Sequence, residues 1–174
     1  AARGRADAAP RVGQGGVCVR VPEFCTARRP KPPPLLCRTP MAIRFVEIHA
    51  ATTPAELNTE WVILENDGKL PFVTRGCGMT VGRRGQSKRK ELGIIDPGFV
   101  LQPGTRVRML TGSPGVADQG TPHEDGADGI TNYYLLLPKP YLQGAGTVLT
   151  LTLRGQIVAK GEHDPAAAAG LVAK

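Results

Sequence analysis

The clearest structural signal in the chain is an alternating stretch near its end, Thr147-Val148-Leu149-Thr150-Leu151-Thr152-Leu153. Successive side chains of a β-strand point to opposite faces, so the three leucines share one face and the residues between them share the other. The next residues, Arg154-Gly155-Gln156, have the composition of a hairpin turn, and Ile157-Val158-Ala159-Lys160 returns as a second strand. This stretch therefore predicts an antiparallel β-hairpin.

The same signals recur upstream. Glu60–Glu65 is rich in β-forming residues and is followed by the turn residues Asn66-Asp67-Gly68, and Arg106–Leu110 alternates like a strand. Further short strands are predicted over 43–50, 72–74, 79–81, 93–95, 99–101 and 133–137. With 22 glycines and 16 prolines to supply turns, a count of seven to nine short strands predicts an all-β sandwich or barrel.

The net charge of +7 is concentrated before residue 41. Residues 1–40 hold eight Lys/Arg and two acids, a net of +6, whereas residues 41–174 hold fourteen and thirteen, a net of +1. The first segment also has seven prolines and no hydrophobic periodicity, which predicts disorder because it cannot bury enough apolar surface. The β domain is therefore predicted over 41–163, followed by a flexible, alanine-containing tail at 164–174.

Two interpretations of residues 1–40 stay open. Met41 directly precedes the first predicted strand, so it is a candidate natural start, and residues 1–40 would then be upstream sequence read in frame. Alternatively, the segment is a genuine basic, proline-rich arm that contacts nucleic acid or an acidic partner.

Several classes of protein are disfavoured. No apolar run approaches the ~18 residues that a membrane-spanning helix needs, and residues 1–40 lack the apolar core of a secretion signal. We therefore expect a cytoplasmic protein without a membrane partner. Cys18, Cys25 and Cys37 are too far apart for ordinary zinc-ligand pairs, and Cys77 between two glycines is typical of a small buried residue.

The best candidate binding site is a basic run within a predicted polar loop at 82–90. Its five cations are Arg83, Arg84, Lys88, Arg89 and Lys90. They could neutralise phosphates and give salt-sensitive, non-specific nucleic-acid binding. The alternative interpretation is a solvated loop that keeps a nearly neutral domain soluble. No aromatic residue is interleaved to stack on bases, which disfavours single-strand recognition.

A long loop at 113–131 is acidic instead. It holds Asp118, His123, Glu124, Asp125 and Asp128, whose oxygens could bind a divalent cation, but the calcium-loop pattern is missing. We therefore predict no metal site and no cofactor.

Catalytic patterns are weak. The chain has three histidines and no G-x-S-x-G motif. Glu47 and Glu60 could form a carboxylate pair, or be rim charges, with Glu60 accepting backbone hydrogen bonds at a corner. Trp61 on its strand is expected to fill the sandwich core. The sequence thus predicts that the protein is not an enzyme.

Three segments together resemble the lamin-tail domain family. Leu57–Asn66 is similar to its E-W-x-x-L-x-N strand, Phe99–Gly112 to its L-x-P-G-x-x-V-x-V-x-T-G segment, and 148–158 to its closing hairpin. The order and spacing also match, over roughly residues 43–160. The family's tryptophan after the first motif is absent here, since the corresponding stretch 73–81 contains Cys77 and Met79 instead.

The resemblance implies an immunoglobulin-like β-sandwich and a module that binds or assembles without catalytic residues. Family members occur in animal lamins and in many bacterial proteins. We therefore expect a non-catalytic interaction module whose partner is another protein or a second copy. Its contact surfaces would be the oppositely charged loops at 82–92 and 113–131, which would allow head-to-tail self-association. The alternative function is electrostatic nucleic-acid binding through 83–90 and the basic N-terminal segment.

Overall fold

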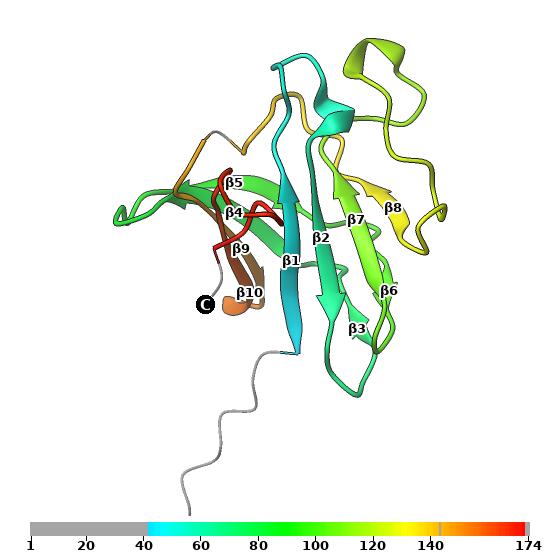
Figure 1. Cartoon of the computed structure of the whole chain (residues 1–174). Coiled ribbons are helices and arrows are strands. Elements are labelled where there is room, and N and C mark those ends of the chain that lie inside the picture. The colour runs from blue at the N-terminus through cyan, green and yellow to red at the C-terminus, as the bar shows by residue number, and fades with distance from the viewer. Residues whose placement is uncertain (1–41, 143, 173–174) are drawn as a thin grey trace, which may run out of the picture. The chain divides into compact units, whose positions relative to one another are not determined.

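Two four-stranded sheets and a two-stranded ribbon form the described part of the chain (Figure 1). The computed structural model describes residues 42–142 and 144–172, all within one compact unit, Arg38–Lys174. The predicted disordered segment at 1–40, its three cysteines and Met41 lie outside the described residues.

The first sheet has the strand order β1-β2-β7-β8, and its β7–β8 pair is parallel. Its strands are β1 (Ile43–His49), β2 (Trp61–Asn66), β7 (Arg106–Leu110) and β8 (Thr131–Tyr134). The second sheet is antiparallel, with the order β10-β9-β4-β5. Its strands are β4 (Gly78–Arg83), β5 (Arg89–Ile94), β9 (Thr147–Leu153) and β10 (Gln156–His163).

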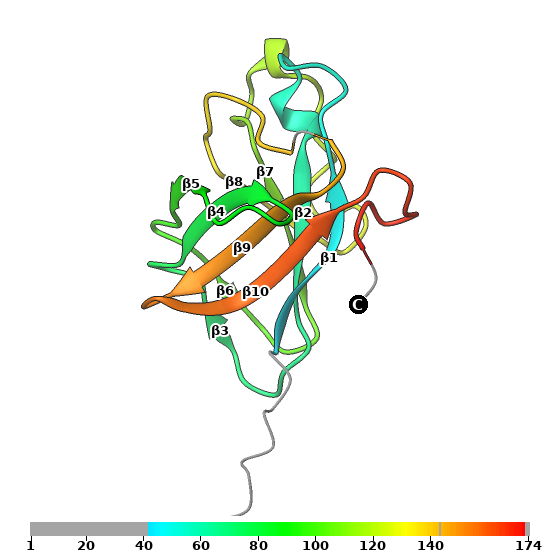
Figure 2. The same cartoon turned by 90° about the vertical axis from the view of Figure 1, so that its left-hand side faces the viewer.

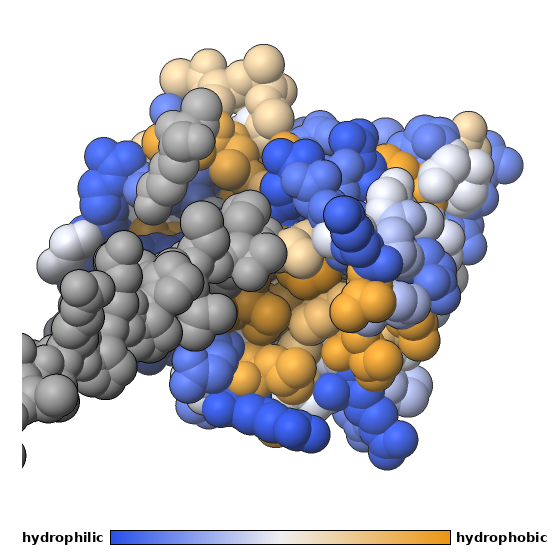
Figure 3. All heavy atoms as spheres, turned by 90° about the horizontal axis from the view of Figure 1, so that it is seen from below, coloured by the Kyte–Doolittle hydropathy of each residue, from blue (hydrophilic) through white to orange (hydrophobic). Residues whose placement is uncertain are grey.

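The shorter elements complete the sandwich. The ribbon pairs β3 (Phe72–Val73) with β6 (Val100–Leu101), and two 3-10 helices lie at η1 (Leu57–Thr59) and η2 (Ala117–Gln119). The ribbon contributes the fully buried Leu101 to the core, while the paired Val73 and Val100 are each 53% exposed. Apolar side chains accordingly gather on the lower face of the molecule (Figure 3).

The core lies between the two sheets, whose strands run across one another (Figure 2). Alternate residues of each strand enter it, as the period-two pattern requires. The buried set includes Phe45, Val62, Leu64, Met79, Met109, Leu149 and Leu151. The predicted all-β sandwich is thus confirmed, and the hairpin at 147–160 forms with β9 at the predicted bounds.

Some predicted elements need correction. The described residues form ten strands rather than seven to nine. The predicted polar loop at 82–90 belongs largely to a β-hairpin, because β4 continues to Arg83 and β5 already begins at Arg89. The strand predicted at 133–137 begins two residues earlier and ends at Tyr134, since Leu136 adopts a φ of 54°, outside the strand region.

The predicted flexible tail makes contacts in its described part that the sequence did not indicate. Residues 164–172 turn back onto the sandwich, where the Ile48 N–H donates to the Ala169 carbonyl (2.9 Å) and the Val172 N–H to the Glu162 carbonyl (2.9 Å). Gly170 permits this turn, since its φ is 63° and an added Cβ would lie 1.9 Å from the Ile48 oxygen. The tail therefore covers β1 and the end of β10.

Trp61 is buried, but not in the core between the sheets, so that prediction is wrong as well. It forms a separate cluster with Ile63 and Leu110 on the outer face of the first sheet. The reason is the alternation along β2, where Val62 and Leu64 take the inner face.

Candidate anion-binding site at the β4–β5 hairpin

A tight turn brings the predicted cations together. The Gln86 N–H donates to the Arg83 carbonyl (3.1 Å), and Gly85 adopts a φ of 75°, a left-handed conformation that glycine takes readily. This turn folds β5 back on β4, and the tip of the hairpin projects away from the strands of the first sheet (Figure 1).

The register then decides which faces the cations occupy. Lys90 lies opposite Val81, and paired residues of neighbouring strands share a face. Val81 packs against the core, and Arg83, two residues further along β4, follows it on that inner face. Arg83 and Lys90 therefore line the same side of the hairpin.

A hollow of about 420 Å³ lies at this hairpin and is lined by consecutive residues of both its strands. Four of the five predicted cations line it, namely Arg83, Lys88, Arg89 and Lys90. Tyr141 and Thr147 form part of its wall. Burial raises the pKa of Tyr141 well above its ordinary value, so its phenol stays neutral. Within the described residues no carboxylate lines this hollow, which gives it a positive potential.

The two arginines are held by backbone carbonyls. Arg83 Nη1 donates to the Ala145 oxygen (3.0 Å), and Arg89 Nη1 approaches the Val148 oxygen (3.5 Å). Each guanidinium has five N–H donors, so one such contact fixes its position and leaves others for a ligand. Lys88 and Lys90 are exposed and form no ion pair with the described residues.

Arg84 stands apart from this group. It forms an ion pair and a hydrogen bond with Glu162 of β10, a side chain that is only 10% exposed. The hydrogen bond to Glu162, followed by the charge of that carboxylate, raises the pKa of Arg84. The positive charge of Arg84 is therefore largely matched within the fold, and this residue does not line the hollow.

The acidic loop has a structural role that the sequence did not reveal. Asp128 pairs with the buried Arg108 of β7, whose hydrogen bond lowers the pKa of that carboxyl. Asp125 accepts from the Asn132 N–H (2.7 Å), and the Asn132 amide donates to the His123 carbonyl (2.7 Å). These contacts fasten the loop to β7 and β8. No group of three or more His, Cys, Asp or Glu residues that could hold a metal is found among the described residues.

The same loop covers an aromatic cluster that sequence analysis missed. His49 stacks on Trp61 at 5.2 Å, and His123 meets its edge at 5.6 Å. The Arg108 guanidinium lies over the same ring at 5.2 Å. The alternation of β2 would have placed Trp61 on the outer face, but nothing in the sequence marks which distant side chains cover it.

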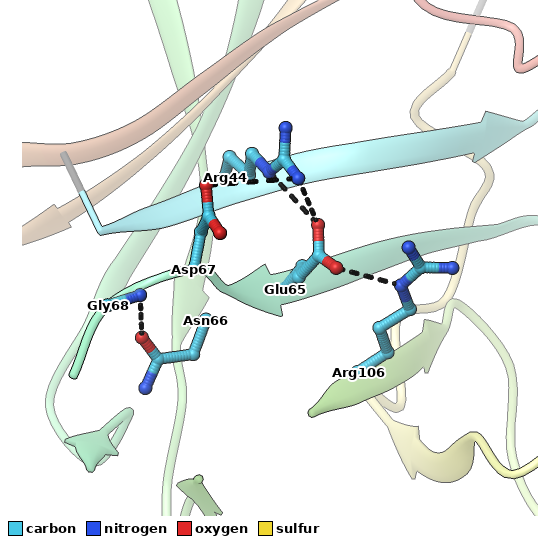
Figure 4. A network of polar contacts seen from close by, with 6 residues as sticks. All are labelled: Arg44, Glu65, Asn66, Asp67, Gly68 and Arg106. Atoms are coloured by element: carbon cyan, nitrogen blue, oxygen red, sulfur yellow. Dashed lines mark hydrogen bonds and ion pairs between the residues drawn. The ribbon is translucent and has the colours of Figure 1, made fainter. Parts of the chain in front are cut away.

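A second pair of exposed arginines lies on the outer face of the first sheet (Figure 4). Glu65 lies between them, with Arg44 at 2.7 Å and Arg106 at 3.1 Å from its carboxylate oxygens. Arg44 also lies 3.9 Å from a carboxylate oxygen of Asp67, so two carboxylates offset the charge of this surface, whereas no carboxylate among the described residues lines the hollow.

Glu60 and Cys77, two residues considered for catalysis, are buried within the fold. Glu60 is fully buried and accepts from the Thr111 hydroxyl (2.8 Å) and from the N–H groups of Tyr141 (2.9 Å) and Leu142 (3.1 Å), as its corner interpretation predicts. Cys77 is fully buried, and desolvation raises the pKa of its thiol, which disfavours the nucleophilic thiolate. None of the described helices is long and apolar enough to cross a membrane.

Comparison with known proteins adds no assignment. The sequence matches no protein-family model and no curated protein. The similarity to the lamin-tail domain accordingly stays a prediction from the three sequence segments.

Proposed function

We propose that the protein is a non-catalytic binding module that holds an acidic segment of a partner protein at its β4–β5 hairpin. The observation that carries this proposal is the hollow in which Arg83, Lys88, Arg89 and Lys90 meet without a lining carboxylate. The carbonyl contacts of Arg83 and Arg89 support it, because positioned guanidiniums lose little freedom when they bind a carboxylate. The lamin-tail resemblance favours a binding role as well.

Head-to-tail self-association through the acidic loop has less support. Asp125 and Asp128 already bind groups of the same chain, and their carboxylates would have to leave these partners to reach a second copy. The carboxylates of a separate acidic chain do not have to leave partners in this fold before they bind the hairpin.

Nucleic acid is the second candidate partner, because the same cations could neutralise phosphates. The hollow is concave and small, which suits carboxylate side chains of a peptide better than the convex surface of a duplex. Binding of a duplex through its phosphates would depend steeply on salt and little on base sequence.

The proposal is tested by titrating a glutamate-rich peptide into the full chain at low salt. The double variant Lys88→Ala/Lys90→Ala should weaken binding about three- to thirtyfold, as expected for the loss of two exposed charge contacts. Lys69→Ala/Lys160→Ala is the matched control, since it removes the same charge from exposed positions outside the hollow, and it should bind as the parent chain does.

Equal weakening by both double variants would reduce the effect to net charge and contradict the proposal. Duplex DNA that binds the parent chain more tightly than the peptide, and loses affinity in the Lys88→Ala/Lys90→Ala variant, would assign the hollow to nucleic acid instead.

A further inference from the structure

Three of the four outer edges of the two large sheets are each contacted at one position by another segment of the chain. Residues 169–172 bind the backbones of β1 and β10, through Ile48 (2.9 Å) and Glu162 (2.9 Å). The Asp125 side chain accepts the N–H of Asn132 in β8 (2.7 Å). Each contact shortens the stretch of free backbone with which the strand of another chain could pair.

The fourth edge, β5, is open. It is the last strand of the second sheet, and within the described residues Arg89–Ile94 forms backbone hydrogen bonds to β4 alone. Most of its side chains are exposed, and Ile94 is 72% exposed. Its outward N–H and C=O groups are those that an additional strand would bind.

The charges of this edge indicate which strand would fit. Lys88, Arg89 and Lys90 are consecutive cations, and Glu91 is the one acid of β5. A neutral or basic strand gains nothing from this row, whereas an acidic strand gains charge complementarity along it. The same charges explain how an open edge can avoid indiscriminate pairing.

We infer that an extended acidic segment of a partner protein adds to β5 as a fifth strand of the second sheet. This inference rests on the proposed function and places the backbone of the partner segment beside β5, with acidic side chains directed toward the β5 cations that also line the hollow. Arg89 and Lys90 are successive residues and face opposite sides of the sheet, so neighbouring side chains of the added strand each meet a cation. The partner should therefore carry consecutive acidic residues rather than alternating ones.

Ile94 adds a second requirement for the sequence of the partner segment. It lies four positions beyond Lys90, across the register shift between Glu91 and Gly93, and therefore at most about 13 Å away along the strand. An apolar residue about four positions from the acidic run would cover its exposed side chain. The predicted ligand thus combines consecutive acids with one apolar residue at that spacing.

The experiment compares three versions of a short peptide with a glutamate run and one leucine, titrated into the full chain. One version is unmodified. The other two are N-methylated at every second backbone amide, and the methylated positions of one peptide are the unmethylated positions of the other. In an added strand alternate N–H groups face β5, so one phase should lose binding at least about tenfold and the other should bind like the unmodified peptide. The two phases carry equal numbers of methyl groups and control for each other.

Equal affinities of the two phases would overturn strand addition, while the effect of Lys88→Ala/Lys90→Ala would still support the proposed function. No binding of the unmodified peptide would overturn both. A dimer of the chain that excludes the peptide would assign the edge to a second copy, and would also overturn the inference.

A gain-of-function variant gives independent support. Glu91→Gln removes the single acidic side chain of β5 without changing its length, and should tighten peptide binding a few-fold. An unchanged or weaker affinity would contradict an acidic strand beside this residue.

Discussion

Arg108 is only 2% exposed, and its guanidinium contacts residues from three places in the chain. Its terminal nitrogens bind Asp128 and Asn132 (3.2 Å for the latter), and its guanidinium lies over Trp61. Removing one partner of a buried ion pair leaves a charge without compensation, which destabilises the fold. Asp128 therefore fastens the acidic loop to the sheet.

The stability that Asp128 contributes should depend on pH. Its pKa is lowered in the folded state, so its contribution is present above the usual pKa of an aspartate, near 4, and is lost as pH falls through the lowered value. Asp128→Asn should be less stable than the parent chain at pH 7, and the difference should shrink below about pH 4. Urea unfolding of both proteins across pH measures it, and a difference that stays constant down to pH 2 would contradict the pairing.

Glu60 provides a second prediction at this scale. Glu60→Ala removes the acceptor of two buried N–H groups and a hydroxyl, which should lower the free energy of unfolding by about 3 kcal/mol or more. Glu60→Gln keeps one carbonyl acceptor and should lose less. If the two variants were equally stable in urea, the hydrogen bonds of the carboxylate would not be important for the fold.

At the scale of elements, local sequence patterns predict strands well, but they do not reveal contacts between residues that are far apart in the sequence. The period of two in 147–153 places β9 with its correct bounds, because alternation is a property of the strand itself. The basic run is likewise visible in the sequence. The pairing of Arg84 with Glu162 spans 78 positions, and no local signal indicates it.

The contacts of the tail were missed for the same reason. Its alanines and glycine have no strand or helix period, and its order comes from hydrogen bonds to β1 and β10. Gly170→Ala should break this contact, because the added methyl meets the Ile48 carbonyl. Hydrogen exchange at the Ile48 and Val172 amides should accelerate.

Gly155→Ala is the control for that variant. Gly155 has a similar φ of 77°, but an added Cβ meets nothing within 4 Å. It should cost only the conformational penalty, about 1 kcal/mol, and leave exchange at Ile48 unchanged. Protection of Ile48 that survives Gly170→Ala would show that the tail contact does not cover this edge.

At the scale of the whole molecule, the distribution of charge distinguishes two surfaces. Arg44 and Arg106 are paired with Glu65 and Asp67 beside the first sheet, whereas the hollow of the hairpin has four cations and no lining carboxylate among the described residues. The net charge of the chain does not reveal this difference, because it does not say where the carboxylates lie. An acidic partner is attracted most strongly where the local potential is most positive, which favours the hairpin.

The most direct measurement is an NMR titration of the isotope-labelled full chain with the glutamate-rich peptide. We expect the largest chemical-shift changes at the backbone amides of Lys88–Ile94 and around Thr147, with those of Arg44 and Arg106 unchanged. Shifts centred on Arg44 and Arg106, or spread evenly over all exposed cations, would contradict a binding site at the β4–β5 hairpin.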